Sequence, residues 1–142
     1  MIGVAFFKNP VNIWIPSSLS QLQSAGVGVK LVSSTPNAAF FAKECGMFTD
    51  EDLEFPAKEF YEKGQTNKMW LDSKLGKMKV LHSACKVHKY TLIDQLLSAG
   101  EETMLVTNKP DDRATLTRAH LGVAKLDPNN SCLVNSANIL LS

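Results

Sequence analysis

The sequence predicts an α/β domain whose strands form a mostly parallel sheet. Short apolar runs alternate along the chain with segments of helical spacing, and strands separated by helices are typical of parallel sheets. The chain has 142 residues, which is the length of one ordinary domain. It contains no internal repeat and no low-complexity segment. We therefore expect a single domain that covers residues 1–142.

The N-terminal third is predicted to contain two strands and two helices. Residues 2–7 and 29–32 are short apolar runs typical of strands. Between them, Pro16 opens a predicted helix. Thr35 is expected to cap the second helix, with Pro36 at its first position, where the missing N–H of proline costs nothing.

The middle of the chain is more polar and predicts two short helices. They cover residues 57–62 and 68–74, and residues 64–67 are expected to form the loop between them. Trp70 and Leu71 are the apolar residues expected to pack inward from the second helix.

Strands and helices alternate again in the last part of the chain. The predicted elements are a strand at 79–81, a helix, a strand at 104–107, a short helix at 111–117 and strands at 121–124 and 139–141. Spacings of three and four are expected to place Val87, Tyr90, Ile93 and Leu97 on one face of the longer helix. Glycine is a natural C-terminal stop, and the glycines that end the longer predicted helices are Gly26, Gly46 and Gly100.

Charge and cysteine content exclude several classes of protein. With 15 basic and 14 acidic residues the net charge is +1, which gives no reason to expect binding to nucleic acid or to an anionic membrane. No segment approaches the roughly 20 apolar residues that cross a bilayer, so we expect no transmembrane segment. Cys45, Cys85 and Cys132 are odd in number and far apart, which favours a reducing, cytoplasmic location.

One run of residues has the composition of a metal site. His82, Cys85 and His88 form an H-x-x-C-x-x-H pattern. Closed zinc sites have four ligands with tighter pair spacing, so we expect no metal here. The alternative is a loop histidine, a small buried cysteine and an exposed histidine at a helix start.

Phe40 and Phe41 are neighbours in the second predicted helix. Adjacent residues of a helix cannot both point into the same core, so we expect one ring to be partly exposed. Such a ring is a weak indication of a contact surface.

Four stretches of the chain carry a family resemblance. Residues 3–11 read G-V-A-F-F-K-N-P-V and are similar to G-I-V-G-I-K-D-P-V. Residues 24–32 and 42–47 are similar to S-A-G-V-T-V-R-M-V-T-G-D-N and A-L-E-C-G-I. Residues 88–93, H-K-Y-T-L-I, are similar to D-K-H-T-L-V. Residues 106–141 resemble V-T-G-D-G-T-N-D-A-P-A-L followed by the A-D-I-G-L-A and S-D-I-I-L strands.

In this order and spacing, the four stretches resemble the haloacid-dehalogenase-like phosphorylation domain of P-type calcium-transporting ATPases. The autoinhibited, calmodulin-regulated pumps of plants are the most similar kind. The resemblance implies a Rossmann-like parallel sheet flanked by helices. It also implies that this sheet is incomplete, because the D-K-T-G-T strand that bears the phosphorylated aspartate does not occur in the chain.

The chemistry that the resemblance implies needs carboxylates that the chain lacks. Phosphoryl transfer from ATP requires a carboxylate nucleophile, magnesium and a cation on the phosphate. The family loop T-G-D is replaced by S-S-T-P at residues 33–36. In the T-G-D-G-T-N-D loop, the first aspartate is replaced by Asn108 or Lys109, and Pro110 restricts a turn that the family builds with glycine.

Three residues are candidates for what remains of the site. Lys89 stands at the position of the lysine that contacts the phosphoryl group in the family; the alternative is a solvated lysine in the first turn of a helix. Asp111 and Asp112 are what is left of the magnesium loop; the alternative is that they are acidic residues favoured by a helix N-terminus. We therefore expect no catalytic residue, no metal site and no cofactor, and magnesium and ATP are implied only for the ancestor.

The function expected from these features is that of a catalytically inactive remnant of a calcium-pump phosphorylation domain. If it acts at all, it acts as a binding or regulatory module, with an intact calcium pump or a second copy of itself as partner. The alternatives are a weak magnesium-dependent phosphatase of the haloacid-dehalogenase type, a part in ATP-driven calcium transport, or no selected activity.

The resemblance also predicts a vacancy in the sheet. Strands 29–32 and 104–107 correspond to the two neighbours of the missing strand. Each buried N–H or C=O group left unpaired at such edges costs about 1–3 kcal/mol. The two strands could pair directly, residues 2–7 could enter the vacancy, or a partner could donate a strand. A chain with open edges is expected to be marginally stable and to self-associate or bind a partner.

Overall fold

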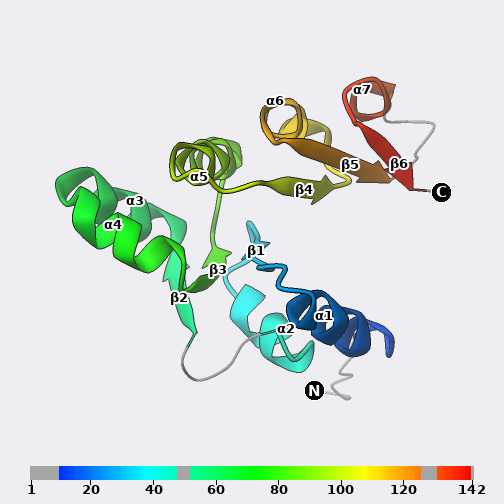
Figure 1. The fold of residues 1–142 in the computed structure, drawn as a ribbon, viewed down its shortest axis with the longest axis horizontal. Coiled ribbons are helices and arrows are strands. Elements are labelled where there is room, and N and C mark those ends of the chain that lie inside the picture. The colour runs from blue at the N-terminus through cyan, green and yellow to red at the C-terminus, as the bar shows by residue number, and fades with distance from the viewer. Residues whose placement is uncertain (1–9, 48–51, 126–130, 142) are drawn as a thin grey trace, which may run out of the picture.

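The computed structural model describes residues 10–47, 52–125 and 131–141 (Figure 1). Seven α-helices and six strands lie in these ranges: α1 (Ile15–Ser24), β1 (Leu31–Val32), α2 (Ala38–Glu44), β2 (Leu53–Pro56), α3 (Ala57–Thr66), α4 (Lys68–Leu75), β3 (Met78–His82), α5 (Lys86–Ser98), β4 (Met104–Thr107), α6 (Arg113–Arg118), β5 (Leu121–Lys125), α7 (Ser131–Val134) and β6 (Ile139–Leu141). A short 3-10 helix, η1 (Pro110–Asp112), precedes α6.

The strands form two three-stranded sheets in which every pair is parallel. Their orders are β1-β3-β2 and β4-β5-β6. The predicted α/β class with parallel strands is confirmed, but the strands are divided between two sheets. Among the described residues β1 pairs only with β3 and β4 only with β5. Direct pairing of β1 with β4, one of the ways in which the vacancy could have closed, therefore does not occur.

The helices lie on opposite faces of the strands. Figure 1 shows α1 and α2 below the strands, with α5, α6 and α7 above them. Leu19 of α1 packs against a buried cluster that includes Ala38 and Ala42 of α2 and Val80 of β3. Because α1 and α2 share this cluster, they cover the same face of the first sheet.

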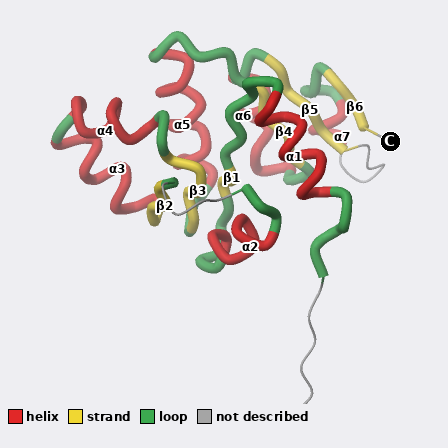
Figure 2. The backbone as a smooth tube through the Cα atoms, turned by 60° about the horizontal axis from the view of Figure 1, so that its bottom comes forward, coloured by secondary structure: helices red, strands yellow, loops and turns green. Residues whose placement is uncertain are grey.

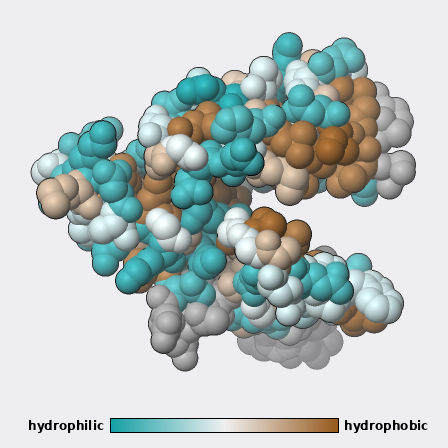
Figure 3. All heavy atoms as spheres, in the orientation of Figure 1, coloured by the Kyte–Doolittle hydropathy of each residue, from teal (hydrophilic) through white to brown (hydrophobic). Residues whose placement is uncertain are grey.

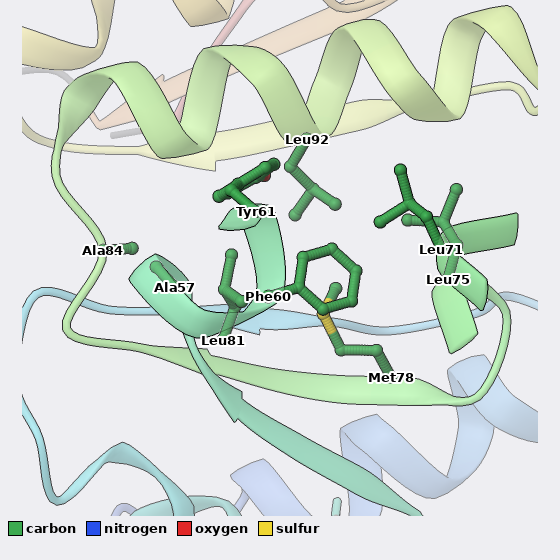
Figure 4. Packing of buried hydrophobic residues seen from close by; sticks show 9 residues of the cluster. All are labelled: Ala57, Phe60, Tyr61, Leu71, Leu75, Met78, Leu81, Ala84 and Leu92. Atoms are coloured by element: carbon green, nitrogen blue, oxygen red, sulfur yellow. The ribbon is translucent and has the colours of Figure 1, made fainter. Parts of the chain in front are cut away.

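The largest core lies between the first sheet, the α3–α4 pair and α5. Nine buried residues form it (Figure 4): Ala57, Phe60, Tyr61, Leu71, Leu75, Met78, Leu81, Ala84 and Leu92. Phe55 and Trp70 lie at its margin with ring centroids 5.5 Å apart. The predicted inward packing of Trp70 and Leu71 is confirmed.

Helix α3 is longer than expected, and the predicted loop at 64–67 is wrong. Gly64 lies inside the helix, and a Cβ atom there would come within 2.9 Å of Leu71 in α4. Glycine therefore allows α3 and α4 to pack closely side by side, as Figures 1 and 2 show. Asn67 alone separates the two helices, and its side chain accepts a hydrogen bond from the N–H of Trp70 at 3.0 Å.

Two further local features differ from the predictions: the start of α2 and the presence of β2. Helix α2 begins at Ala38, two residues later than Pro36, because the hydroxyl of Thr35 lies 2.6 Å from that of Ser33 in a turn that precedes the helix. Strand β2 was not predicted, since it is four residues long and contains Glu54 and Pro56; its pairing with β3 holds it in the sheet.

The buried face of α5 does not coincide with the apolar row at 87, 90, 93 and 97. Val87 and Tyr90 are 62% and 41% exposed, whereas Leu92 and Ile93 are buried. The inward face begins at His88, whose ring stacks on Tyr61 with centroids 5.2 Å apart, and continues through Leu92. The face of α5 that is turned toward the core therefore includes the polar residue His88, which the spacing of the apolar residues did not indicate.

Among the described residues, the second sheet is covered by α6 and α7 on one face. Leu105 and Ala124 belong to a small core with Leu116 of α6 and Leu133 of α7. Residues on the other face of the outer strands are exposed: Met104, Val106, Ile139 and Leu141. In the space-filling view, apolar side chains of this sheet face a hollow (Figure 3).

The predicted strands at 79–81, 104–107, 121–124 and 139–141 are confirmed, and β1 is shorter than the predicted 29–32. Helix α7 was not predicted. The predicted strand at 2–7 lies outside the described residues. Of the helices in the described part of the chain, none has the length and hydropathy needed to cross a membrane.

Candidate functional site

Three side chains meet at the edge where the parallel strands end. Lys89 lies in the first turn of α5, which follows β3. Thr107 is the last residue of β4, and Asp112 ends the 3-10 turn that leads into α6. In parallel α/β sheets this carboxyl edge is where ligands bind.

Lys89 and Asp112 form a bidentate ion pair. The Lys89 ammonium donates to both carboxylate oxygens of Asp112, each at 2.8 Å. The Thr107 hydroxyl donates to Oδ2 of the same carboxylate, also at 2.8 Å. The backbone N–H of Lys109 in turn donates to the Thr107 hydroxyl at 3.1 Å, which fixes its orientation.

This pair is almost entirely removed from water. The side chains of Lys89 and Asp112 are only 12% and 4% exposed. The alternative of a solvated lysine at position 89 is therefore wrong. Burying a charge is tolerated when it is paired and hydrogen-bonded, and both conditions are met here. The positive charge of Lys89 is neutralised within the protein.

Thr107 is the member of the cluster that sequence reasoning did not single out. Its signal was present, since it ends an apolar strand and stands where the family motif also has a threonine. A hydroxyl at the end of a strand can donate to a carboxylate in the turn that follows.

Asp111 is exposed and is not part of the cluster, although it precedes Asp112 directly. The two carboxylates considered as a weak cation site are thus not brought together. No group of three or more His, Cys, Asp or Glu side chains with the arrangement of a metal site occurs in the described ranges.

The loop after β1 contributes backbone contacts rather than a carboxylate. Ser33 donates its N–H to the carbonyl of Leu81 at 3.0 Å and accepts from the N–H of Ala84 at 2.9 Å. Its hydroxyl accepts the N–H of Thr35 at 3.1 Å. Where the resemblance implies a T-G-D loop, the chain has a serine–threonine turn that is hydrogen-bonded to β3.

The H-x-x-C-x-x-H residues do not converge on one point. His82 Nδ1 contacts the Ser83 hydroxyl at 3.1 Å, whereas His88 Nδ1 lies 3.4 Å from the Cys85 thiol. Cys85 is exposed, so the expected burial of this cysteine is wrong. Hydrogen bonding from the backbone N–H of His88 lowers the pKa of the Cys85 thiol, because it stabilises the thiolate.

Comparisons with known proteins define the class. No protein-family model matches the chain. Calcium-transporting ATPase 3, plasma membrane-type, of Oryza sativa subsp. japonica is 28% identical over 99% of this chain and 14% of its own length. Calcium-transporting ATPase 2, plasma membrane-type, of Arabidopsis thaliana is 27% identical over the same shares of both chains. Plasma membrane calcium-transporting ATPase 4 of Homo sapiens is 26% identical over 99% of this chain and 12% of its own length.

The chain is therefore similar over almost its whole length to P-type calcium-transporting ATPases. The pumps it is similar to are of the plasma-membrane type, and the chain fits a fragment of such a pump. It spans about one seventh of the length of the plant relatives it matches.

Proposed function

We propose that this chain is a catalytically inactive derivative of a calcium-pump phosphorylation domain of the haloacid-dehalogenase type, and that it acts in the cytoplasm as a binding or regulatory module. The observation that carries the proposal is the closed Lys89–Asp112 pair at the carboxyl edge of the strands. The two charges of this pair neutralise each other.

The surroundings of the pair support the absence of catalysis. Phosphoryl transfer depends on magnesium and on cations that neutralise the oxygens of the transferred group. Asp112 is engaged by Lys89 and Thr107, and Lys109 lies in the loop where the family has a carboxylate. The S-S-T-P loop at 33–36 supplies none either. Magnesium binds mainly through carboxylates, so these residues do not fit it.

A test of catalysis uses the whole chain with radiolabelled ATP and, separately, an aryl phosphate. We expect no acid-stable phosphoenzyme and no magnesium-dependent hydrolysis. The matched control is Asp112→Asn, which is expected to give the same background rate. Hydrolysis that requires magnesium and disappears in Asp112→Asn would instead establish the phosphatase alternative.

Magnesium affinity provides an independent measurement. We expect a dissociation constant weaker than about 1 mM, because Asp111 is exposed, Lys109 is close by and magnesium gives up its waters reluctantly. Calorimetric titration of the chain and of Asp111→Asn should give the same weak heats. Tight binding that the substitution abolishes would contradict the proposed inactivity.

The binding role is supported by an aromatic pair on α2. Phe40 and Phe41 are 56% and 45% exposed, and their rings meet edge to face with centroids 5.7 Å apart. Both rings are exposed, whereas the sequence led us to expect exposure of one. Paired exposed aromatic rings are typical of contact surfaces. We propose an intact plasma-membrane-type calcium pump as the partner.

Recovery of that pump from detergent-solubilised plasma membranes tests the partner. The immobilised chain is expected to retain the calcium pump, and Phe40→Ala/Phe41→Ala to lose it. Met69→Ala is the control, because Met69 is 84% exposed on α4 and is separate from the pair. Failure to recover the pump, or equal recovery with the double variant, would exclude this partner at this surface.

A further inference from the structure

A groove of about 1440 Å³ lies at the edge where the parallel strands begin, opposite the edge that holds Lys89 and Asp112. Residues of α3 and α4 line one part of it, and the end of α5 together with residues 101–104 lines another. Residues 26–28 and 30, which lead from α1 to β1, complete the lining. The groove is therefore separate from the site at the carboxyl edge.

Several helices end at this groove. Helix α4 ends at Leu75 and α5 at Ser98, and both residues belong to the lining, as does Gly26, which follows α1. The last carbonyl groups of a helix carry a partial negative charge equivalent to roughly half an elementary charge. The groove thus lies at the negative ends of α1, α4 and α5, which favours positively charged groups.

The protein already holds one ammonium group at this place. Lys30 donates to the carbonyl oxygens of Leu75 and Met78, each at 2.7 Å. Burial, and to a lesser degree the charge of Lys79, lower the pKa of Lys30, whereas the nearby charge of Glu101 raises it. The carbonyl groups at the end of α4 therefore bind an ammonium group although it is partly withdrawn from water.

Carboxylates lie at the end of α5, where the helix dipole disfavours them. Glu101 and Glu102 follow this helix and are exposed, and its last turn contains no basic residue. Asp72 of α4 lines the groove from another element and is exposed as well. Departures from local electrostatic preference are expected at functional sites, because the ligand supplies the missing charge.

The groove keeps an excess of carboxylates when its own bases are counted. Four carboxylates line it, of which Asp94 forms an ion pair with Arg118 of α6. Two lysines line it, of which Lys30 is bound by carbonyl groups and Lys68 is exposed on α4. Three carboxylates and the helix ends thus remain to attract a cation.

A second kind of observation also indicates a ligand with hydrogen-bond donors. Gln95 of α5 lines the groove, and its Oε1 atom is buried without a hydrogen-bond partner in the described part of the chain. Buried acceptors are normally paired, because an unpaired one has lost its water without compensation. Rotation of the terminal amide would turn Oε1 toward the groove, where a bound N–H group can satisfy it.

Apolar side chains accompany these polar groups. Leu71 and Leu75 of α4 (Figure 4) and Leu96 of α5 belong to the lining. Within the described ranges, the carboxylates are not gathered in threes as a metal site requires. Since they are divided between α4 and the end of α5, a fitting ligand carries two or more ammonium groups joined by an apolar chain.

We propose that this groove binds a linear aliphatic polyamine. Glu101 and Glu102 hold one ammonium group, Asp72 holds another, and the methylene chain lies on the leucine side chains of α4 and α5. Each ammonium–carboxylate contact is a charge-assisted hydrogen bond, and the chain between the ammonium groups covers apolar surface. This binding does not depend on the Lys89–Asp112 pair or on the Phe40–Phe41 surface.

Calorimetric titration of the whole 142-residue chain with spermine, at constant ionic strength, tests the proposal without any substitution. We expect saturable binding at one site. Butylamine carries one ammonium group on an apolar chain and should bind at least about 10-fold more weakly, because it can engage only one of the two walls. The side-chain amide resonances of Gln95 should shift on addition of spermine.

Glu101→Gln/Glu102→Gln is the disrupting variant, and its positions are exposed. It should weaken spermine binding at least about 10-fold, because it removes two charges and keeps the shape of the side chains. Glu54→Gln/Glu59→Gln is the matched control, since it removes the same charge at exposed positions of β2 and α3 outside the groove. Its affinity for spermine should stay within about 2-fold of that of the unsubstituted chain.

Absence of saturable spermine binding by the unsubstituted chain overturns the proposal, and this result does not depend on any variant. Equal weakening by the two double variants overturns it as well, because it would show attraction to the overall charge. The peptide acetyl-KLLK-amide distinguishes a second source of the same chemistry. If the peptide binds more tightly than spermine and is lost in Glu101→Gln/Glu102→Gln, the polyamine is the wrong ligand and the groove takes a protein segment.

Discussion

Lys89 and Asp112 are separated by 23 positions in the sequence and are joined by two hydrogen bonds of 2.8 Å. The ammonium of Lys89 and the carboxylate of Asp112 thus satisfy each other's charge and hydrogen bonding. In an active phosphoryl-transfer site, such a lysine must be available to the phosphate when it arrives. Here the lysine contributes to the fold, because it ties the first turn of α5 to the turn before α6.

The first prediction concerns the energy of this pair. Lys89→Met should lower the free energy of unfolding by about 3–5 kcal/mol, because it leaves the Asp112 carboxylate buried without its cation. Lys89→Met/Asp112→Asn should be destabilised by clearly less than the sum of the two single variants. Urea denaturation of the four proteins completes the double-mutant cycle. Additive effects would show that the two charges do not interact.

The second prediction concerns Tyr61, whose hydroxyl donates to the carbonyl of His88 at 2.7 Å. Burial raises the pKa of Tyr61 well above its ordinary value, because the phenolate would lose its water. The folded state therefore favours the neutral phenol, and its contribution to stability is complete below about pH 10 and is lost as the pH rises beyond that. In Tyr90→Phe, which leaves Tyr61 as the single tyrosine, phenolate absorbance should appear only as the chain unfolds in alkali. Ionisation near pH 10 with retained helical signal would contradict this.

At the scale of helices and strands, the sequence correctly predicted features that depend on neighbouring residues, such as the ends of helices. Gly26, Gly46 and Gly100 follow α1, α2 and α5 with positive φ values of 80°, 68° and 82°, as expected of glycines that end helices. The prediction was wrong where a contact between residues of different helices determines the structure. Gly64 was predicted to lie in a loop, but it belongs to α3, where the absence of a side chain leaves room for Leu71 of α4.

A third prediction concerns the close contact of α6 with β5. A Cβ atom at Gly122 would lie 2.9 Å from the backbone carbonyl oxygen of Leu116, which cannot rotate away. Gly122→Ala should therefore push α6 from the sheet and cost roughly 1–3 kcal/mol of unfolding free energy. Gly76→Ala is the matched control, since no atom lies within 4 Å of its added methyl group. Equal melting temperatures for the two variants would show that α6 yields without cost.

At the scale of the whole molecule, the family resemblance led us to expect that strands 29–32 and 104–107 would each lack a neighbour. Among the described residues, β1 and β4 are edge strands of two separate sheets. Of the candidate residues Lys89, Asp111 and Asp112, the structure brings Lys89 and Asp112 together. That they bind each other could not be predicted, because it depends on how α5 crosses between the two sheets. Side-chain contacts connect α5 to both halves: His88 stacks on Tyr61, and Asp94 pairs with Arg118 of α6.

The last prediction is cooperative unfolding. Helix α5 packs on the core of the first sheet through Leu92 and is joined to the second half by the Lys89–Asp112 and Asp94–Arg118 ion pairs. The two halves should therefore melt together, with equal calorimetric and van't Hoff enthalpies of about 100 kcal/mol for a chain of this length. Lys89→Met removes the buried one of these two ion pairs. Its melting should separate into two transitions, one followed by the fluorescence of Trp70 beside the first sheet and the other by exchange of β5 amides. Two transitions in the unsubstituted chain would show that the two sheets unfold independently in spite of these contacts.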